Sequence, residues 1–177
     1  MIQSRLSDGP LDEFNRTWAE YEAGFGSCSS NYWLGLKTIA ALTAGKDQEL
    51  RIELEDWYGD KRFARYDNFS ISGASDFYRL FVGGFSGGDA GNCLETFDLG
   101  SNNAHHYMKF STPDKDNDTT DENNWASFWS SGWWFNYCFY SNLNGLYKKD
   151  EIGFSWGSWI DWTRAIKKSE MKIRDKK

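Results

Sequence analysis

The sequence has only two histidines, two prolines and three cysteines among its 177 residues, and it has no long apolar run. The two histidines, His105 and His106, are adjacent and therefore poorly placed to act on one point, and neither has the spacing of a zinc site. No Gly-rich loop of the phosphate-binding or dinucleotide-binding type is present. Paired carboxylates could form a glycosidase, but nothing in the sequence marks one with a raised pKa. We therefore expect a protein that is not an enzyme.

Basic residues are fewer than acidic ones. The net charge of −6 argues against a nucleic-acid partner, because such proteins need a basic footprint. No stretch approaches the ~20 apolar residues of a membrane span, and the first residues lack the basic-then-apolar pattern of a signal peptide. Aromatic residues, in contrast, are abundant: they make up 18% of the chain and include ten tryptophans. At this length we expect one domain with an aromatic core.

The three cysteines cannot all pair within the chain, because their number is odd. Cys28 and Cys93 could form a disulfide and leave Cys138 free. Alternatively, all three are reduced thiols that pack as small apolar side chains. The sequence leaves both arrangements open.

Two helices are predicted near the start of the chain. Pro10 suits the first turn of a helix, and aromatic residues follow at positions 14, 18, 21 and 25, which share one helical face. Gly24 and Gly26 would end this helix. A second helix is predicted over residues 31–44, with the apolar residues at positions 34, 39 and 42 facing inward and Gly45 as its C-terminal cap.

The pattern then changes to that of an antiparallel sheet. Leu50, Ile52 and Leu54 alternate with charged residues, as in a strand with one wet face. Gly59 and Asp60 end this strand, and further strands are predicted at residues 62–66, 77–82, 152–156 and 171–174. The glycine-rich segment 83–91 predicts irregular structure. Two long loops, 83–107 and 114–150, flank a short strand-like segment, and loops of this length are uncommon unless they are functional or disordered.

Three acids spaced two apart, Asp114, Asp116 and Asp118, open the second loop. Carboxylates this close repel one another unless a cation or solvent lies between them, and ligand sets made only of oxygen suit Ca²⁺. The loop is not an EF-hand, because the sixth position from Asp114 is Thr119 rather than Gly and the twelfth is Trp125 rather than Glu. The alternative is a solvated acidic turn.

Aromatic residues crowd the segment after these acids, without a helical or a strand period. Irregular aromatic backbone beside an acidic loop is typical of a ligand pocket, although several of these rings must belong to the core. They are Trp125, Phe128, Trp129, Trp133, Trp134, Phe135, Tyr137, Phe139 and Tyr140.

The segments FSTPDKDND, GWWFNYC, SNLNGLY and SEMKIR resemble the fibrinogen-like C-terminal domain of ficolins, tachylectins, tenascins and fibrinogen. The segments RTWAEYEAGFG, YWLGL, LRIELEDWYG and GGFSGGDAGN also fall in the family's order, so the resemblance covers residues 1–177. It implies an α+β fold, with a central twisted antiparallel sheet, two short helices and a loop-rich calcium and ligand region at 83–151. Because MIQSRLSDG resembles the segment after the family's first disulfide, we expect a truncated domain without the usual N-terminal subdomain.

The resemblance also implies a site. Ca²⁺ would be bound by the carboxylates of Asp116 and Asp118 and by the main-chain carbonyls of Thr120 and Glu122, with Asp114 outside the ligand set. The ligand pocket would lie beside it, around a cis peptide bond. Its residues would be Trp129, Trp134, Tyr137, Cys138 and Phe139, with the cis bond between Tyr137 and Cys138.

Three departures from the family pattern concern this site. Phe139 stands where the lectins carry His, and the loop Lys148–Glu151 is shorter than that of acetyl-binding relatives. Trp125 stands at about the position of the cysteine that bridges to the position of Cys138 in the family. The usual disulfide is therefore expected to be missing.

The expected function is non-catalytic recognition by a secreted, extracellular protein. Glycan binding, supported by calcium and including acetylated glycans, in the manner of innate-immune lectins, is favoured narrowly. The alternative is a protein-interaction module of a matrix or signalling protein. Oligomers would form through the missing N-terminal region, and sequons at Asn15, Asn68 and Asn117 fit a glycoprotein.

Overall fold

The computed structural model describes residues 1–6, 13–95, 104–146, 153–160 and 165–176. Its helices are α1 (Trp18–Ala23), α2 (Leu36–Thr43) and α3 (Trp125–Phe128), with a 3-10 turn at Ala74–Asp76. Its strands are β1 (Gln3–Arg5), β2 (Phe25–Gly26), β3 (Tyr32–Trp33), β4 (Gln48–Glu55), β5 (Lys61–Ile71), β6 (Leu80–Gly87), β7 (Ser141–Asn142), β8 (Ser155–Trp156) and β9 (Lys168–Asp175). Within these segments, no helix has the length and apolar character to cross a membrane.

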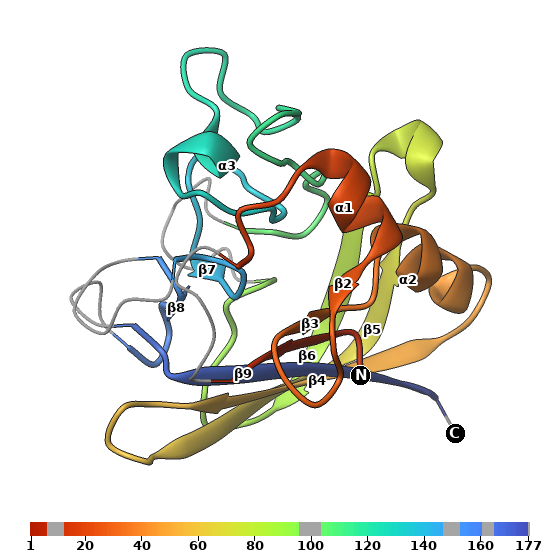
Figure 1. Ribbon diagram of the computed structural model, residues 1–177. Coiled ribbons are helices and arrows are strands. Elements are labelled where there is room, and N and C mark those ends of the chain that lie inside the picture. The colour runs from red at the N-terminus through yellow and green to blue at the C-terminus, as the bar shows by residue number, and fades with distance from the viewer. Residues whose placement is uncertain (7–12, 96–103, 147–152, 161–164, 177) are drawn as a thin grey trace.

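Seven strands form one antiparallel sheet in the order β2-β3-β1-β9-β4-β5-β6, while β7 and β8 form a separate pair. The last strand, β9, lies in the middle of this sheet, and the first strand, β1, lies beside it (Figure 1). Met171 of β9 is opposite Ile52 on one side and Gln3 on the other. The two ends of the described chain are therefore joined by the ladder that completes the sheet. The predicted α+β fold with a central antiparallel sheet is confirmed.

The alternation in β4 is also confirmed. Leu50, Ile52 and Leu54 are buried, whereas the charged residues between them face the opposite side. Helix α2 packs on the buried side of the sheet, where the Thr43 hydroxyl accepts a hydrogen bond of 3.3 Å from the backbone N–H of Ile71. Helices α1 and α2 lie over the same side of the strands (Figure 1). The aromatic core fills the space between the sheet and the loop region.

The first helix is shorter than predicted. Thr17 and Glu20 form a capping box, with the Thr17 backbone N–H donating to the Glu20 carboxylate at 2.9 Å, so the helix begins at Trp18 and not near Pro10. Pro10 itself lies outside the described residues. Phe25, predicted on the helix, belongs to β2, but its ring still packs against those of Phe14 and Tyr21 at 5.1 Å. The aromatic pattern correctly predicted the packing and not the backbone.

The second helix also begins later than predicted. Residues 32 and 33 form β3, and α2 starts only at Leu36, after Gly35 with a φ of 99°. Ile39 is buried as predicted, whereas Leu42 is 41% exposed and does not face inward. Gly45 follows the helix with a φ of 64°, the conformation expected of a C-terminal glycine.

The glycine-rich segment 83–91 is irregular only in its second half: β6 continues through its first part to Gly87, and residues 88–91 form no strand. The strand lies at the sheet edge, and the Glu95 carboxylate accepts hydrogen bonds from the backbone N–H groups of Gly84 (3.1 Å) and Phe85 (3.0 Å). A side chain thus replaces the missing neighbour strand.

Of the other predicted strands, some are confirmed and others are not. Residues 61–71 and 168–175 extend the predicted strands, and residues 77 and 78 form a left-handed turn before β6. Residues 155–156 pair only with β7 and do not return to the main sheet, while Ile152 lies outside the described residues. The short strand-like segment between the two long loops, residues 108–111, makes an isolated bridge at Ser111 and no strand.

The exposure of α2 residues gives a matched stability test. Ile39→Ala removes a fully buried side chain and should lower the free energy of unfolding by about 2–5 kcal/mol. Leu42→Ala changes an exposed position of the same helix and should cost less than about 1 kcal/mol. Urea denaturation of both variants measures the difference. Equal losses would mean that Leu42 faces the core after all.

Candidate functional site

We call the loop that begins with Asp114, Asp116 and Asp118 the acidic loop. It is a turn held by hydrogen bonds to its own carboxylates. The Asp116 carboxylate accepts a hydrogen bond from the Asp118 backbone N–H at 3.1 Å. One oxygen of Asp118 accepts hydrogen bonds from the N–H and the hydroxyl of Thr120, at 2.8 and 2.7 Å. The other oxygen accepts the N–H of Trp125 at 2.9 Å, which fixes the start of α3. The Asp116 and Asp118 side chains therefore lie side by side at the base of the loop.

The electrostatics of this pair favour a cation. Burial raises the pKa of Asp116, and the neighbouring charge of Asp118 raises it further. A bound cation would relieve this repulsion. The carbonyl oxygens of Thr120 and Glu122 accept no hydrogen bond from the described part of the chain. Carboxylate and carbonyl oxygens are the kind of ligand that Ca²⁺ takes, so the calcium site stays a prediction for these residues.

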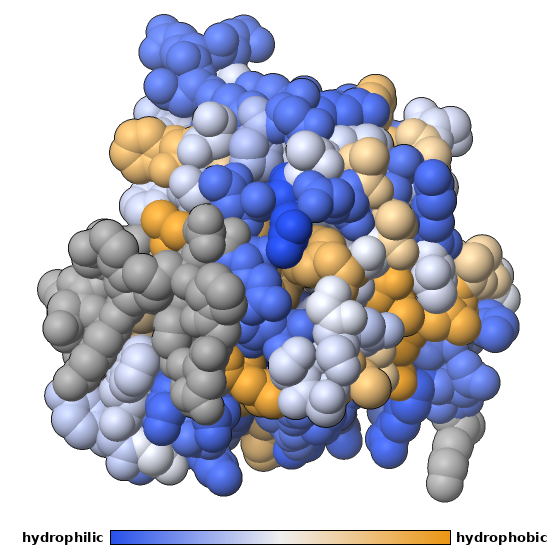
Figure 2. Space-filling view, viewed as in Figure 1, coloured by the Kyte–Doolittle hydropathy of each residue, from blue (hydrophilic) through white to orange (hydrophobic). Residues whose placement is uncertain are grey.

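The pair is not a cluster of many acids. Among the described residues, no group of three or more Asp, Glu, His or Cys side chains converges on one point. A cation here would therefore depend on the carbonyls and on water as well as on the two carboxylates. In Figures 1 and 2 the residues after Asp118 form a hydrophilic projection above α3.

Asp114 faces away from this pair and attaches the loop to the helical layer. Its carboxylate accepts hydrogen bonds from the N–H of Trp18, the first residue of α1, and from the Thr112 hydroxyl, both at 2.8 Å. Lys115 lies over the rings of Trp18 (4.0 Å) and Phe77 (5.2 Å). These contacts give Asp114 a role in docking the loop.

A second contact joins the acidic loop to the predicted pocket. The Thr119 hydroxyl donates to the Asn136 side-chain oxygen at 2.9 Å, and the Asn136 amide donates to the Ala104 carbonyl at 3.0 Å. The Asn136 backbone N–H donates to the Cys138 carbonyl at 3.0 Å. The backbone around Tyr137 is thus fixed from the side of the loop.

The exposed rings lie on both sides of Trp125. Phe128 and Tyr137 are 67% and 59% exposed, and their ring centres lie 5.8 and 6.3 Å from that of Trp125. Trp129 is half-buried and contacts Phe128 at 5.1 Å. We call Trp125, Phe128, Trp129 and Tyr137 the aromatic surface. Figure 2 shows apolar side chains exposed beside α3, below the polar projection.

Two predicted pocket residues do not reach this surface. Trp134 is fully buried, and its indole N–H donates to the Tyr78 carbonyl at 2.8 Å. Phe139 is 2% exposed and packs against Trp129 and Phe135, at 5.1 and 6.1 Å. Both rings belong to the core and cannot stack on a ligand. The prediction that they line the pocket is therefore wrong.

The expected cis bond is also absent, because the described residues contain no cis peptide bond. Cys138 instead adopts a left-handed conformation with a φ of 67°. Its thiol is half-buried, and burial raises its pKa. The indole N–H of Trp129 lies near this sulfur but makes no hydrogen bond of normal geometry.

Phe128 and Trp125 were not predicted as ligand residues, although the sequence carried a signal for them. Asn124 caps α3, with its side-chain oxygen accepting the Ser127 N–H at 2.8 Å. Asn is a favoured cap residue, and residues three apart on a helix share a face. A short helix after Asn124 would have placed Trp125 and Phe128 together.

His105 fixes the backbone on both sides of Tyr137. Its ring nitrogen Nε2 accepts hydrogen bonds from the backbone N–H groups of Tyr140 (3.2 Å) and Ser141 (3.0 Å). The proton therefore sits on Nδ1, which donates to the Trp134 carbonyl at 2.8 Å. Burial lowers the pKa of His105 to about 4. The imidazole is a neutral structural group.

All three cysteines are free thiols, so of the two arrangements left open the Cys28–Cys93 disulfide is wrong. Cys93 is buried as a small apolar side chain, whereas Cys28 is exposed. Of the sequons, Asn117 is used inside the acidic loop, where its amide donates to the Phe110 carbonyl at 2.8 Å. Asn15 and Asn68 are exposed. The loop Lys148–Glu151 lies outside the described residues.

Comparison with known protein families shows the class of protein. A family model for the C-terminal globular domain of fibrinogen beta and gamma chains matches residues 1–176. The chain therefore belongs to the fibrinogen C-terminal domain family, as the resemblance predicted.

Curated relatives give the same assignment. The chain is 41% identical to human fibrinogen-like protein 1 over 186 residues, covering 98% of this chain and 58% of that protein. It is 39% identical to human fibroleukin over 189 residues, covering 99% of this chain and 42% of that protein. The chain thus spans about half the length of these relatives.

Solved structures agree in fold. The lamprey fibrin D-dimer, complexed with the peptide ligand Gly-His-Arg-Pro-amide, superposes with a TM-score of 0.89 at 35% identity, over 99% of this chain and 62% of that one. The fibrinogen-like globe domain of human ANGPTL6 superposes with a TM-score of 0.86 at 38% identity, over 99% of this chain and 77% of that one.

The buried His105 predicts a loss of stability in acid. Its folded pKa of about 4 lies below the ordinary histidine value of 6.5, so the unfolded chain binds more protons between these values. Its contribution is fully present above pH 6.5 and falls by about 3 kcal/mol as the pH drops to 4. Urea denaturation between pH 7.5 and 4.5 should show this slope, and His105→Gln should remove it. A stability that stays flat from pH 6.5 to 5 would contradict the assignment.

Proposed function

We propose that this domain is a non-catalytic, extracellular recognition module that binds a peptide segment of a partner protein on its aromatic surface, with the acidic loop held by Ca²⁺. The exposure of Phe128 and Tyr137 beside a loop that fixes their backbone is the observation that carries this proposal. Exposed aromatic clusters on rigid elements are typical of recognition surfaces.

A peptide is favoured over a sugar by the shape of the surface. Trp134 and Phe139, which would have walled a pocket, are in the core, so the exposed rings form an open surface. The lamprey fibrin D-dimer, of similar fold, was solved with a short peptide. Asp121 and Glu122 are exposed in the adjoining projection, so a ligand with a basic group is favoured.

Glycan binding is the second candidate, and one observation favours it. The indole N–H groups of Trp125 and Trp129 are buried without a hydrogen-bond partner. Ring faces with hydrogen-bond donors beside them suit a sugar, which has both apolar faces and hydroxyl groups.

Ca²⁺ would order the acidic loop and would take no part in a reaction. Asp116 and Asp118, with the carbonyls of Thr120 and Glu122, would hold the ion, whose charge would offset the repulsion between the carboxylates. Asp118 also fixes the start of α3, and the next residue, Thr119, fixes Asn136. Ordering the loop would therefore order both sides of the aromatic surface.

The calcium proposal predicts a thermal shift. At a concentration 100 times its dissociation constant, Ca²⁺ stabilises the folded state by about 2.7 kcal/mol, which for a domain of this size raises the melting temperature by about 5–10 °C. Asp116→Asn should abolish the difference between calcium and chelator, measured by calorimetry. The matched control Asp121→Asn, an exposed acid of the same loop, should keep it. Equal melting temperatures with calcium and with chelator would contradict the site.

The aromatic surface predicts which variants lose ligand. Tyr137→Ala and Phe128→Ala should each weaken binding at least about tenfold, because exposed anchors of this type dominate interface energies. The control is Tyr58→Ala, a ring that is 75% exposed in the turn after β4.

Two probes separate the two candidate functions. Gly-His-Arg-Pro-amide tests peptide binding by calorimetry, and an array of acetylated and plain glycans tests the lectin, each with calcium and with chelator. Calcium-dependent glycan binding that Trp129→Ala abolishes, without peptide binding, would replace the peptide proposal by the lectin. Unchanged peptide binding by Tyr137→Ala would overturn the aromatic surface as the site.

A further inference from the structure

The sequon asparagines of this chain lie in different surroundings. Asn117 is half-buried, and its amide donates to the Phe110 carbonyl at 2.8 Å. Its backbone N–H donates to the Ser111 hydroxyl at 3.0 Å. Phe110 and Ser111 are both fully buried. A glycan on the Asn117 amide would have to lie against the core, so the folded acidic loop disfavours a glycan there.

The Asn68 side chain, in contrast, is exposed and has an accessible amide. It belongs to β5 and lies opposite Gly83 of β6. Within the described segments this amide makes no hydrogen bond. A Cβ atom on the neighbouring Gly84 would lie 3.1 Å from the Asn68 amide nitrogen. Two glycines therefore leave space for a bulky group on this nitrogen, as an N-glycosylation acceptor requires.

A cavity of about 330 Å³ adjoins Asn68 at the edge of the main sheet, and we call it the edge cavity. Asn68 and Ser70, the first and third residues of the sequon, both line it. Phe81 and Tyr107 line it as well, with their ring centres 5.5 Å apart and the Tyr107 side chain 54% exposed. The edge cavity thus offers aromatic surface beside the acceptor amide.

The edge cavity also has polar groups in its lining. The Nδ1 atom of His106 accepts a hydrogen bond from the Val82 backbone N–H at 3.1 Å, so the proton of the neutral ring sits on Nε2. The Glu95 carboxylate lines the cavity and accepts the N–H groups of Gly84 and Phe85. An imidazole N–H and a carboxylate beside aromatic rings match a sugar, which has hydroxyl groups and apolar faces.

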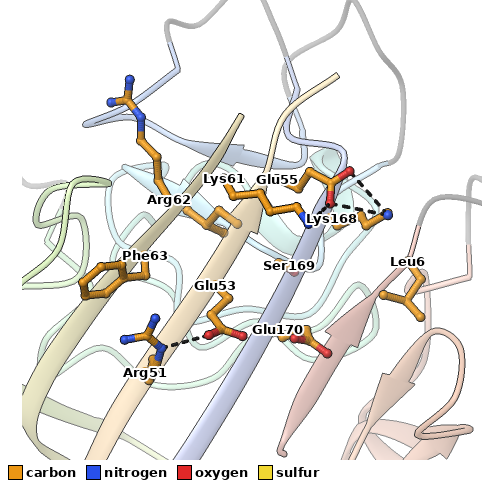
Figure 3. A pocket seen from close by; sticks show the side chains of 11 residues that line it. Leu6, Arg51, Glu53, Glu55, Lys61, Arg62, Phe63, Lys168, Ser169 and Glu170 are labelled. Atoms are coloured by element: carbon orange, nitrogen blue, oxygen red, sulfur yellow. Dashed lines mark hydrogen bonds and ion pairs between the residues drawn. The ribbon is translucent and has the colours of Figure 1, made fainter. Parts of the chain in front are cut away.

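Figure 3 shows a larger groove over β4, β5 and β9, with a volume of about 400 Å³ and a different chemistry. Arg51 pairs there with Glu53 at 2.9 Å. Lys61 and Lys168 both pair with Glu55, at 3.7 and 3.4 Å. These charges satisfy one another, and no sequon residue is among the described residues that line the groove. The edge cavity is therefore the better match to a sugar.

We propose that Asn68 carries an N-linked glycan whose first sugar lies in the edge cavity. The Asn68 Nδ2 atom forms a bond to the anomeric carbon of an oligosaccharide carried on a polyprenyl diphosphate lipid. The bond from that carbon to the diphosphate oxygen breaks, the lipid diphosphate leaves, and the amide releases one proton. The modification rests on the extracellular setting of the proposed function, because this donor is met on the secretory route.

A glycan at Asn68 would also shield the β6 edge. β6 is the last strand of the main sheet, and exposed sheet edges invite pairing with other chains. Glu95 and His106 already accept N–H groups of this strand. A glycan seated beside them would add bulk that excludes an approaching strand.

The first test measures occupancy at each sequon. The full chain is expressed with an added secretion signal in eukaryotic cells, its glycans are released enzymatically in heavy-oxygen water, and the peptides are weighed. Asn68 should be modified and Asn117 should not, while the exposed Asn15 is resolved as a separate peptide. Asn68→Gln and Ser70→Ala should each abolish the signal at position 68, and the control Asn117→Gln should keep it.

An unmodified Asn68 in the secreted, folded protein, or a glycan on Asn117 in its place, would overturn the inference. Because the added signal imposes secretion, this result would leave the peptide-binding proposal standing. Loss of peptide binding in Tyr137→Ala, in turn, tests that proposal without affecting the glycan.

The second test asks whether the first sugar is seated in the edge cavity. An endoglycosidase that leaves one N-acetylglucosamine should keep the melting temperature of the fully glycosylated protein, whereas Asn68→Gln should melt about 2–4 °C lower. Tyr107→Ala should lower the melting temperature of the trimmed protein more than that of the Asn68→Gln variant. The control Tyr58→Ala, at a ring that is 75% exposed, should act equally in both. Equal effects of Tyr107→Ala in both would remove the edge cavity as the seat of the sugar.

Discussion

The aromatic segment that follows α3 is largely irregular, so side chains must satisfy its buried backbone polar groups. In helices and strands the backbone groups bond to one another instead. His105 supplies three of these bonds, to residues 134, 140 and 141. Asn144 donates to the Gly132 carbonyl at 2.9 Å, and Gln3 of β1 donates to the Leu143 carbonyl at 2.7 Å. A Cβ atom on Gly132 would lie 2.5 Å from the Tyr21 ring, so only glycine fits there. The site is rigid because distant residues complete it.

This dependence on distant residues decides what the sequence could predict. The alternation at Leu50, Ile52 and Leu54 indicates a strand through local geometry alone, and that strand is confirmed. In the aromatic segment no period exists, so nothing local distinguishes Trp134, buried against Tyr78, from Tyr137, which is exposed. The family motifs predicted the fold correctly, but they did not distinguish the buried rings of Trp134 and Phe139 from the exposed ring of Tyr137. Burial there follows from contacts with elements more than fifty residues away.

The acidic loop and the aromatic surface are one structural unit. Cys138 is a free thiol, so non-covalent contacts and not a disulfide connect its surroundings to the loop. These are the Asp118 bond to the start of α3 and the Thr119 bond to Asn136. Both begin in the loop whose carboxylates repel each other. A cation that strengthened this loop would therefore partly replace the constraint that a disulfide normally provides.

The two faces of the domain differ in the kind of interaction that each can support. Around α3, partly buried rings beside fixed backbone allow specific contacts whose strength depends little on salt. On the sheet, the ammonium groups of Lys61 and Lys168 pair with Glu55 at the surface, where salt screens the attraction between charges. Because the core and the sheet separate these faces, a ligand on one leaves the other accessible (Figure 1).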